Sequence, residues 1–490
     1  MKKALKLLKT HYRQIFIVLI FFTLALPMGY MLGIKDPTFL YGVDVTTPLP
    51  SLQQQSFADK VFQNNFEKWW NSHFLMRKIN LKMKNQIYDW MNFGKIHTGY
   101  NNNIIEGRDN YLFEKLYFFD NTPICTNLNI SDLEKIKQLK DFLYRRDIGL
   151  YIVLAPNKVL TYKDKLPARY TYFYHNDCRY YDKIENYLLQ NNIPVFNAQG
   201  LMTEIRKNEK YEPFSKTGTH WNFYGAGRTV QESLKKFGFA EISLKNIDTS
   251  NLPYFKERDI ADLLNLPIEF KTDDKFPYPN FEKTDAIKGN IAVIGNSFSN
   301  EFVKILREVT EVSDITHVEN SPLSHKTASK ILTAKNIFLV YTSLPFRKSN
   351  DQLYQKIDTL LNSENPEFTF SNQDEAIQTS GLSGYENWGR WSDGKLATIR
   401  FSIGRLYNDK KIIFTINPFL TPKHTRQSVT ISHRGEVLTQ WNFEYGKDNS
   451  DTSLLISPDM LDSDGDLELK FEIQNPKSPK ELGIAVMSEK

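Results

Sequence analysis

A serine in a short turn between an apolar strand and a helix is the residue of this chain best placed for nucleophilic chemistry. Residues 291–294 read Ile-Ala-Val-Ile, which is typical of a buried strand, and Gly295 ends this run before Asn296 and Ser297. A helix is expected to begin at Ser299 or just after it. Open α/β sheets bind ligands at the carboxyl ends of their strands, so the Ser297 hydroxyl is expected at that edge. Backbone N–H groups of the turn, with Asn296 and Gly295 in support, could stabilise an oxyanion.

A histidine in a polar turn is the second residue suited to this chemistry. His220 lies in the sequence Thr-Gly-Thr-His-Trp-Asn at 217–222, directly before a segment that is expected to be helical. An imidazole titrates near neutral pH and can act as a general base. A histidine in a loop is more often a structural hydrogen-bonding group. Together with a serine at the end of a strand, it becomes a candidate Ser–His pair.

Helical and extended segments alternate between residues 131 and 341 and would position both side chains. The expected strands are 150–154, 193–196, 291–294 and 337–341, and the expected helices are 131–146, 180–190, 226–237 and 326–332. This alternation predicts an α/β domain with a mostly parallel sheet that is covered by helices on both faces. Upstream, residues 56–93 carry apolar and aromatic side chains at helical spacing. We expect one or two amphipathic helices there, with the aromatic side chains in the core.

The pattern changes after about residue 370, where short extended segments alternate with turns. The expected strands are 396–403, 411–416, 428–432, 454–456 and 467–473. Strands at this spacing without a convincing helix predict an all-β sandwich over residues 369–490, which is a candidate carbohydrate-binding module. Its residues Trp388 and Trp391 are candidates for sugar contacts, although tryptophans of such a domain more often lie in the core.

The first 34 residues have the composition of a membrane anchor. Residues 1–14 form a basic tail, and residues 15–34 form an uncharged apolar run of about the length that spans a bilayer. By the positive-inside rule, the tail stays cytoplasmic and the bulk of the chain is extracytoplasmic, either periplasmic or at the cell surface. A cleaved signal peptide is the alternative, but no clear cleavage site follows the run. Residues 35–55 are then a stalk, and residues 56–368 form the α/β domain.

Composition and spacing exclude several kinds of partner. The 490 residues include 62 basic and 57 acidic side chains, and a net charge of +5 does not argue for nucleic acid. No His, Cys and carboxylate residues have metal-ligand spacing, and no glycine-rich phosphate loop occurs, so neither a metal nor a cofactor is expected. Cys125 and Cys178 could form one disulfide in an exported chain, or they could remain two unpaired thiols.

Four motifs in this order resemble the alginate O-acetyltransferase family, whose members are SGNH-hydrolase-like domains of exported polysaccharide-modifying proteins. The motifs are Gly107-Arg-Asp109, Ala155-Pro-Asn-Lys158, Thr219-His-Trp221 and Gly295-Asn-Ser-Phe298, and the resemblance covers roughly residues 56–345. It implies that Ser297 is the nucleophile and His220 the base. Residues 380–391 resemble a β-sandwich module of polysaccharide biosynthesis proteins.

Three further residues near these motifs have two interpretations each. Asn157 and Lys158 follow a predicted strand and could line the cleft for substrate, or they could belong to a solvated loop. Trp221 could stack on a sugar ring or pack beside His220.

Two positions depart from the family pattern. The family places an aspartate two residues before its histidine, where this chain has Gly218, and its Gly-Asp-Ser signature appears here with Asn296. Loss of that carboxylate partner costs about 10⁴ in rate in a model triad. Three outcomes are open. A carboxylate from elsewhere substitutes, with Asp259, Asp262 and Glu212 as candidates; a Ser–His dyad suffices for slow transfer; or the domain binds glycan without turning it over.

The expected function is O-acetyl transfer, through an ester on Ser297, to hydroxyls of an exopolysaccharide or cell-surface glycan. The alternatives are an acetylesterase and a non-catalytic polysaccharide-binding or scaffold component of the same pathway. Acetyl-CoA is cytoplasmic, and the resemblance implies that a membrane-bound O-acyltransferase partner relays the acetyl group.

Overall fold

The structure is a computed structural model of the whole chain. It describes residues 14, 16–18, 20–21, 40–41, 48–50, 60–73, 77–90, 104–119, 130–171, 179–239, 241–254, 256–268, 270, 272–285, 287–347, 351–362, 370, 377–386, 389–403, 409–447, 451–463, 465–474 and 484–487. Cys125, Cys178, Trp388 and most of the predicted anchor and stalk lie outside these residues. Within the described part of the chain, no helix combines the length and the apolar character that crossing a membrane requires.

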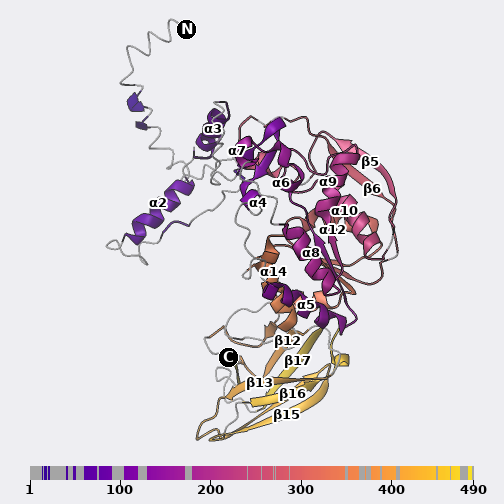
Figure 1. The fold of residues 1–490 in the computed structure, drawn as a ribbon. Coiled ribbons are helices and arrows are strands. Elements are labelled where there is room, and N and C mark those ends of the chain that lie inside the picture. The colour runs from indigo at the N-terminus through magenta and orange to yellow at the C-terminus, as the bar shows by residue number, and fades with distance from the viewer. Residues whose placement is uncertain are drawn as a thin grey trace.

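A five-stranded parallel sheet forms the centre of the α/β domain (Figure 1). Its strand order is β4-β3-β9-β7-β8. The strands are β3 (Gly149–Leu154), β4 (Val195–Asn197), β7 (Ile291–Gly295), β8 (Ile315–Val318) and β9 (Asn336–Tyr341). Every residue of β7 and β9 is buried, because a parallel sheet is covered on both faces, and this explains their continuous apolar sequences. The predicted parallel sheet is confirmed.

Alternate residues of the strands pack into two cores, one on each face of the sheet. Val293 belongs to the core formed with α9, α10 and α12, and the next residue, Ile294, belongs to the core formed with α5, α8, α13 and α14. The helices are α5 (Ile130–Tyr144), α8 (Tyr180–Gln190), α9 (Ala198–Asn208), α10 (Phe223–Lys236), α12 (Ser299–Val309), α13 (His325–Leu332) and α14 (Gln352–Asn362). Helices therefore cover both faces of the sheet, as the sequence predicts.

Short elements surround the carboxyl edge of this sheet. Two antiparallel hairpins are formed by β1 (Ile104–Glu106) with β2 (Leu112–Glu114), and by β5 (Leu244–Ser250) with β6 (Phe276–Phe281). The short helices are α4 (Lys115–Phe119), α6 (Lys158–Thr161), α7 (Ala168–Thr171) and α11 (Asp259–Leu263). Helix α11 packs on β2 through a small apolar cluster that includes Leu112, Ile260 and Leu264. This contact fixes the segment that begins at Asp259.

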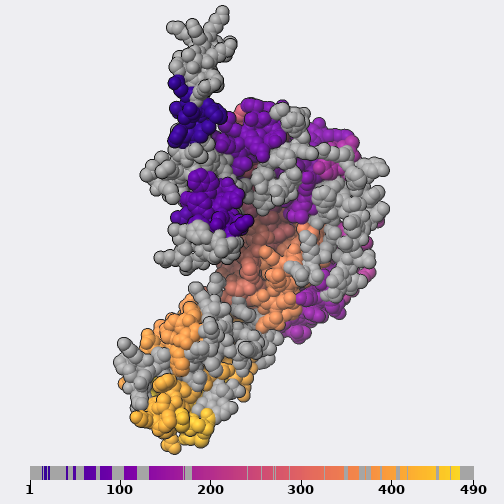
Figure 2. All heavy atoms as spheres, turned by 90° about the vertical axis from the view of Figure 1, so that its left-hand side faces the viewer, coloured from indigo at the N-terminus to yellow at the C-terminus, as the bar shows by residue number. Residues whose placement is uncertain are grey.

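The C-terminal region consists of two antiparallel sheets and forms a lobe at one end of the molecule (Figures 1 and 2). The first sheet has the order β10-β12-β17-β14-β15, and the second has the order β11-β18-β13-β16. The strands are β10 (Ile377–Ser380), β11 (Arg390–Trp391), β12 (Leu396–Ser402), β13 (Lys410–Pro418), β14 (Arg426–His433), β15 (Glu436–Glu444), β16 (Asp451–Ile456), β17 (Asp466–Gln474) and β18 (Ile484–Met487). Side chains of both sheets, such as Phe414 and Phe471, share one core.

Two helices, α2 (Val61–His73) and α3 (Arg77–Trp90), form in the segment predicted to contain one or two amphipathic helices. The prediction that their aromatic side chains are core is wrong for most of them. Trp69 is buried, but Phe66 and Trp70 are each 37% exposed and Trp90 is 68% exposed. For Trp90 the cause lies in α3, whose buried side chains, Asn85 and Gln86, are polar.

Candidate active site

Ser297 lies in the turn that joins β7 to α12, at the carboxyl edge of the sheet. The turn is held by backbone hydrogen bonds from the Asn296 N–H to the Val340 carbonyl at 3.2 Å, and from the Ser299 N–H to the Asn296 carbonyl at 2.9 Å. Gly295 is required before it, because a β-carbon at this position would lie 2.7 Å from the Val340 oxygen. The half-buried Ser297 is therefore presented by a tightly packed strand-to-helix turn.

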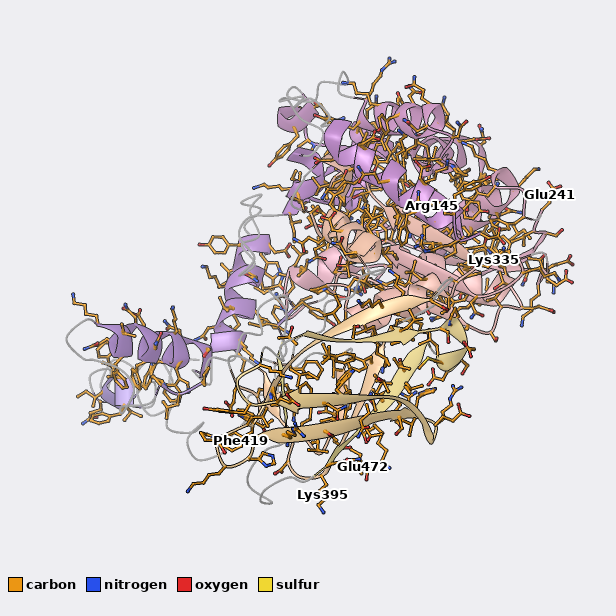
Figure 3. All side chains as sticks on the ribbon, turned by 90° about the horizontal axis from the view of Figure 1, so that it is seen from below. Arg145, Glu241, Lys335, Lys395, Phe419 and Glu472 are labelled. Atoms are coloured by element: carbon orange, nitrogen blue, oxygen red, sulfur yellow. The ribbon has the colours of Figure 1, made fainter. Side chains whose placement is uncertain are left out.

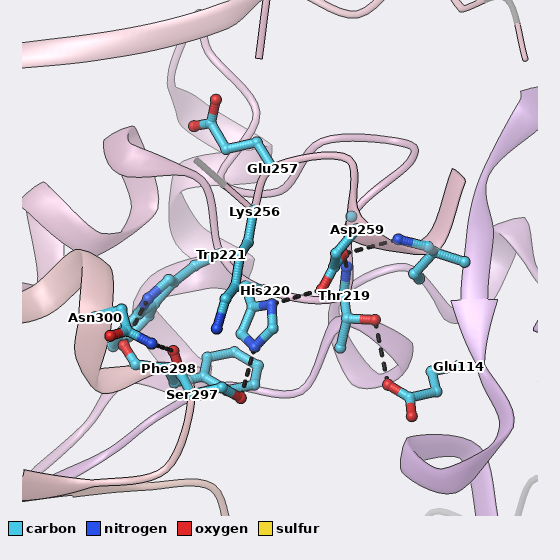
Figure 4. A network of polar contacts seen from close by, with 12 residues as sticks. Glu114, Thr219, His220, Trp221, Lys256, Glu257, Asp259, Ser297, Phe298 and Asn300 are labelled. Atoms are coloured by element: carbon cyan, nitrogen blue, oxygen red, sulfur yellow. Dashed lines mark hydrogen bonds and ion pairs between the residues drawn. The ribbon is translucent and has the colours of Figure 1, made fainter. Parts of the chain in front are cut away.

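His220 lies directly opposite Ser297, in the loop between α9 and α10. Its Nε2 atom is 2.7 Å from the Ser297 hydroxyl oxygen (Figure 4). The imidazole is buried and packs against the ring of Phe298, with ring centroids 4.7 Å apart. Asn222 caps α10 by accepting the Gly225 N–H at 2.9 Å, which fixes the end of the loop. The structure thus brings together the serine and the histidine that the sequence pairs as candidates.

Asp259 supplies the carboxylate that the histidine requires. Its Oδ2 atom is 2.8 Å from Nδ1 of His220, and its Oδ1 atom accepts the backbone N–H groups of Thr219 at 2.7 Å and Ile260 at 2.9 Å. An ionised carboxylate only accepts hydrogen bonds, so Nδ1 of His220 carries a proton and the neutral ring leaves Nε2 free to accept. This is the tautomer that takes a proton from serine in a Ser-His-Asp triad.

The two other candidate acids pair elsewhere. Oδ1 of Asp262 is 3.2 Å from Nε of Arg258, and Oε2 of Glu212 accepts the Tyr162 hydroxyl at 2.6 Å. Of the three carboxylates, Asp259 is the one bonded to His220.

Gly218 makes room for the segment that carries this acid. A β-carbon at Gly218 would lie 2.5 Å from the carbonyl oxygen of Glu257, which also accepts the Ser215 hydroxyl. The Glu257 carboxylate in turn accepts the N–H groups of Phe223 at 2.9 Å and Tyr254 at 2.8 Å. The segment that carries Asp259 to the histidine therefore occupies the space that a side chain at position 218 would need.

Charges around His220 favour its protonated form. Burial alone would lower the pKa of His220, but the hydrogen bond and charge of Asp259, with a contribution from Glu301, outweigh burial and raise that pKa. Lys256, whose side chain extends toward the site in Figure 4, acts in the opposite direction. A raised pKa makes the imidazole a better acceptor for the serine proton.

Two further carboxyl groups are buried near the site. Burial raises the pKa of Glu301, on the first turns of α12, to about 7, and it raises the pKa of Glu257 to about 7 as well. Within the described residues, neither oxygen of Glu301 has a hydrogen-bond partner. In the same part of the chain, no group of three or more His, Cys, Asp or Glu residues could hold a metal ion.

The Ser297 N–H is the available oxyanion donor of the turn. Among the described residues it has no acceptor, whereas the Phe298 N–H donates to Oδ1 of Asn296 at 3.2 Å. The Asn296 amide is thus used to tie the turn, with its Nδ2 atom 3.4 Å from the Thr342 hydroxyl. Asn300 donates from Nδ2 to the Ser297 carbonyl at 3.0 Å, which orients the peptide groups of the nucleophile.

Trp221 and Asn157 are buried and make hydrogen bonds within the protein, and substrate binding by either side chain stays a prediction. The indole N–H of Trp221 donates to the Phe298 carbonyl at 3.2 Å. Asn157 caps α6 by accepting the Val159 N–H at 2.8 Å, and it donates to the Tyr117 carbonyl at 3.0 Å. Both side chains therefore hold segments next to the site in place.

Lys158 is also buried, and substrate binding by its side chain stays a prediction. Its Nζ atom donates to the carbonyl oxygens of Leu112 at 2.8 Å, Lys216 at 2.9 Å and Gly218 at 2.7 Å. Burial lowers the pKa of this ammonium to about 7, and the three carbonyl groups use all three of its donors. Lys158 therefore joins β2 to the loop that holds His220. Sequence reasoning misses this because no local pattern marks a lysine that points inward.

Trp391 is half-buried in the C-terminal region, and its ring edge meets Phe419 at a centroid distance of 6.3 Å. Phe419 is 40% exposed and lies at the margin of this region (Figure 3). Trp388 lies outside the described residues. Sugar binding by these tryptophans stays a prediction.

Residues 104–246 match the model of a protein family described as the SGNH hydrolase-like domain, acetyltransferase AlgX. This segment is similar to the SGNH hydrolase-like domain of AlgX-type acetyltransferases. The resemblance drawn from four motifs is thereby confirmed. The matched segment includes His220 and ends before Asp259 and Ser297. A comparison with curated proteins gives no match.

Several solved structures are similar to the chain. Pseudomonas aeruginosa AlgX is 17% identical over 79% of this chain and 94% of its own, with a TM-score of 0.41. The O-acetyltransferase domain of Pseudomonas putida AlgJ is 19% identical over 53% of this chain and 99% of its own, with a TM-score of 0.39. Bacillus cereus PatB1 with a sulfonyl adduct is 15% identical over 52% of this chain and 97% of its own, with a TM-score of 0.36.

Proposed function

We propose that this chain is a polysaccharide O-acetyltransferase that carries the acetyl group on Ser297. The observation that carries the proposal is the unbroken chain of hydrogen bonds from Ser297 through His220 to Asp259. The alternative of a non-catalytic binding protein rests on the absence of an aspartate at position 218. Asp259 supplies a carboxylate to His220 in its place. Residues 104–246, which include His220, are similar to an acetyltransferase domain, and this similarity supports O-acetyl transfer as the reaction of the triad.

In the first half-reaction, the Ser297 oxygen attacks the carbonyl carbon of an activated acetyl group while Nε2 of His220 takes the hydroxyl proton. The oxyanion forms next to the Ser297 N–H, which donates to it. Collapse of the tetrahedral intermediate breaks the bond to the donor, and the imidazolium returns its proton to that leaving group. The product is acetyl-Ser297 with a neutral His220.

In the second half-reaction, a sugar hydroxyl attacks the acetyl-serine ester. His220 takes the proton of that hydroxyl as the new carbon–oxygen bond forms, and then returns it to the Ser297 oxygen as the ester breaks. Asp259 stabilises the imidazolium in both halves without itself becoming protonated. The enzyme ends unchanged, and the glycan carries one acetyl ester.

The surroundings proposed for this reaction follow from the sequence. The apolar run at 15–34 is proposed as a membrane anchor that places the site outside the cytoplasm, in the periplasm or at the cell surface. The acetyl group would then be relayed by a membrane-bound O-acyltransferase, because acetyl-CoA stays in the cytoplasm. The two C-terminal sheets are proposed to form a β-sandwich that holds the glycan acceptor, an exopolysaccharide or cell-surface glycan.

The proposal is tested by intact mass after exposure of the full chain to an activated acetyl ester such as p-nitrophenyl acetate. One added acetyl group is expected on the wild type, mapped to Ser297, and none on Ser297→Ala or His220→Ala. Adding oligosaccharides should then discharge the acetyl group onto sugar. Release of free acetate at the same rate without any acceptor would favour an esterase. A wild type that stays unmodified and releases no acetate, yet binds glycan, would overturn the enzyme assignment.

A further inference from the structure

Helix α3 presents a stripe of apolar side chains to solvent. Ile79, Met83, Ile87 and Trp90 are 38%, 56%, 50% and 68% exposed. They follow one another at spacings of four, four and three residues, which places them on one face of the helix. Four such side chains in line are an exposed apolar patch rather than scattered surface residues.

Two buried polar side chains bind α3 to the α/β domain. Asn85 and Gln86 are buried; Nδ2 of Asn85 donates to the Leu264 carbonyl at 2.8 Å, and Oε1 of Gln86 accepts the Ile268 N–H at 3.0 Å. A surface helix normally buries its apolar face and exposes its polar face. In α3 the buried side chains Asn85 and Gln86 are polar, whereas the apolar stripe is exposed. The hydrogen bonds to residues 264–268 thus hold the helix with its stripe in solvent.

The neighbouring helix α2 also exposes apolar side chains. Its Phe66 and Trp70 rings lie 6.0 Å apart, and each side chain is 37% exposed. In Figure 1, α2 and α3 lie together, well away from the C-terminal strands. The exposed apolar side chains of these two helices therefore lie in one part of the molecule.

We infer that the apolar stripe of α3 lies in the interface of a lipid bilayer with anionic headgroups. The sequence of α3 contains Arg77, Lys78, Lys82 and Lys84 against a single acidic residue, Asp89. An apolar face beside lysines is the composition of helices that lie in the plane of anionic membranes, and tryptophan, here Trp90, favours the interface. The predicted anchor at 15–34 would bring α3 near the membrane, and the inference is independent of the acetyl-transfer proposal.

A protein groove is the competing occupant of this stripe. A groove that recognises an amphipathic helix through its apolar anchors has no general need for surrounding lysines. A lipid surface does, because each lysine near an anionic membrane strengthens binding roughly fivefold. The dependence on headgroup charge therefore separates the two occupants.

Photo-cross-linking from the stripe tests the inference. The residue p-benzoylphenylalanine replaces Met83 or Ile87 in the full chain, which is reconstituted with vesicles of phosphatidylglycerol or of phosphatidylcholine. Lipid adducts, detected by mass spectrometry, are expected at both positions, with the higher yield in phosphatidylglycerol. The matched control places the same residue at Leu455, which is 62% exposed on β16 in the C-terminal region, and no lipid adduct is expected there.

A charge variant completes the test. The double substitution Lys82→Gln with Lys84→Gln should weaken binding to phosphatidylglycerol vesicles by roughly 25-fold and lower the adduct yield at position 83 accordingly, and should change the yield little in phosphatidylcholine. Adduct yields at 83 and 87 no higher than at 455 would overturn the inference. Cross-links from position 83 to another protein in whole cells, without lipid adducts, would assign the stripe to a protein partner instead.

Discussion

The α-carbon of Gly218 faces the carbonyl oxygen of Glu257 so closely that a β-carbon there would lie 2.5 Å from that oxygen. Two residues further along, the same segment delivers Asp259 to His220. The glycine and the distant aspartate are thus two parts of one arrangement. Restoring an aspartate at 218 would collide with the segment that now carries the acid.

The first prediction concerns this contact. Gly218→Asp should lower activity rather than raise it, and should destabilise the fold by about 1–3 kcal/mol, the usual cost of overpacking a buried site. Urea denaturation of the variant measures this loss. Gly200→Ala is the control, because nothing lies within 4 Å of a β-carbon at this exposed position in α9, and it should be neutral or stabilising. Higher activity in Gly218→Asp would contradict the arrangement described here.

A second prediction separates the acid from its neighbours. Asp259→Asn should lower the rate of acetyl-Ser297 formation by about 10⁴, because an amide can hold His220 in the wrong tautomer and does not stabilise the imidazolium. Asp262→Asn should acylate at close to the wild-type rate, since Asp262 pairs with Arg258. Stopped-flow release of p-nitrophenol measures both rates. Equal rates in the two variants would remove Asp259 from the mechanism.

The pH dependence of acylation gives a third prediction. His220 must be neutral to accept the serine proton, so the rate falls on the acid side as His220 is protonated. Asp259 raises and Lys256 lowers the pKa of His220. Lys256→Met should therefore move the acid limb of the profile to higher pH, whereas Lys256→Arg, which keeps the charge, should leave it in place. An acid limb at the same pH in Lys256→Met would show that this lysine does not act on the imidazole.

Stability should also depend on pH through Glu301. Burial raises the pKa of Glu301 from 4.5 to about 7, so the folded state holds this proton more tightly than the unfolded chain does. Its contribution to stability is full below pH 4.5 and is lost as the pH rises to about 7, a difference of about 3 kcal/mol. Glu301→Gln should flatten the fall in unfolding free energy between pH 5 and pH 8. The exposed Glu311→Gln should leave the fall unchanged.

A fifth prediction concerns the buried ammonium of Lys158. Lys158→Met would leave the carbonyl oxygens of Leu112, Lys216 and Gly218 without their donor, which should cost about 3 kcal/mol or more. Lys163→Met, at an exposed position nearby, should leave the denaturation midpoint where it is. A similar midpoint in both variants would mean that the ammonium does not join β2 to the His220 loop.

Much of the catalytic sheet could be predicted from the sequence. The apolar runs of β7 and β9 are continuous because both faces of the sheet are covered, and helix α8 has the predicted bounds of 180–190. Ser297 could be predicted because it follows an apolar strand in a strand-to-helix turn. His220 could be predicted because it lies in a polar turn directly before a helix. These signals are local, so a single sequence contains them.

The parts that could not be predicted depend on contacts between distant segments. Asp259 lies 39 residues beyond His220, at the first residue of α11, whose position is set by the contacts of Gly218 and Ser215 with Glu257 and by the packing of α11 on β2. No periodicity distinguishes Asp259 from Asp262, three residues away. The inward-pointing Lys158 and the outward-pointing aromatic side chains of α2 and α3 likewise reverse what their residue types favour, because tertiary contacts outweigh the average preference.

The path that brings the acid to His220 has a consequence for the classification of sequences. A pattern that requires aspartate two residues before the histidine would class a chain like this one as a degenerate, inactive copy. Glycine at that position instead leaves space for a downstream carboxylate, and the diagnostic feature becomes a pair of positions far apart in the sequence, as Gly218 and Asp259 are here. Under the proposed triad, a search that accepts this pair keeps such a chain among the candidate enzymes.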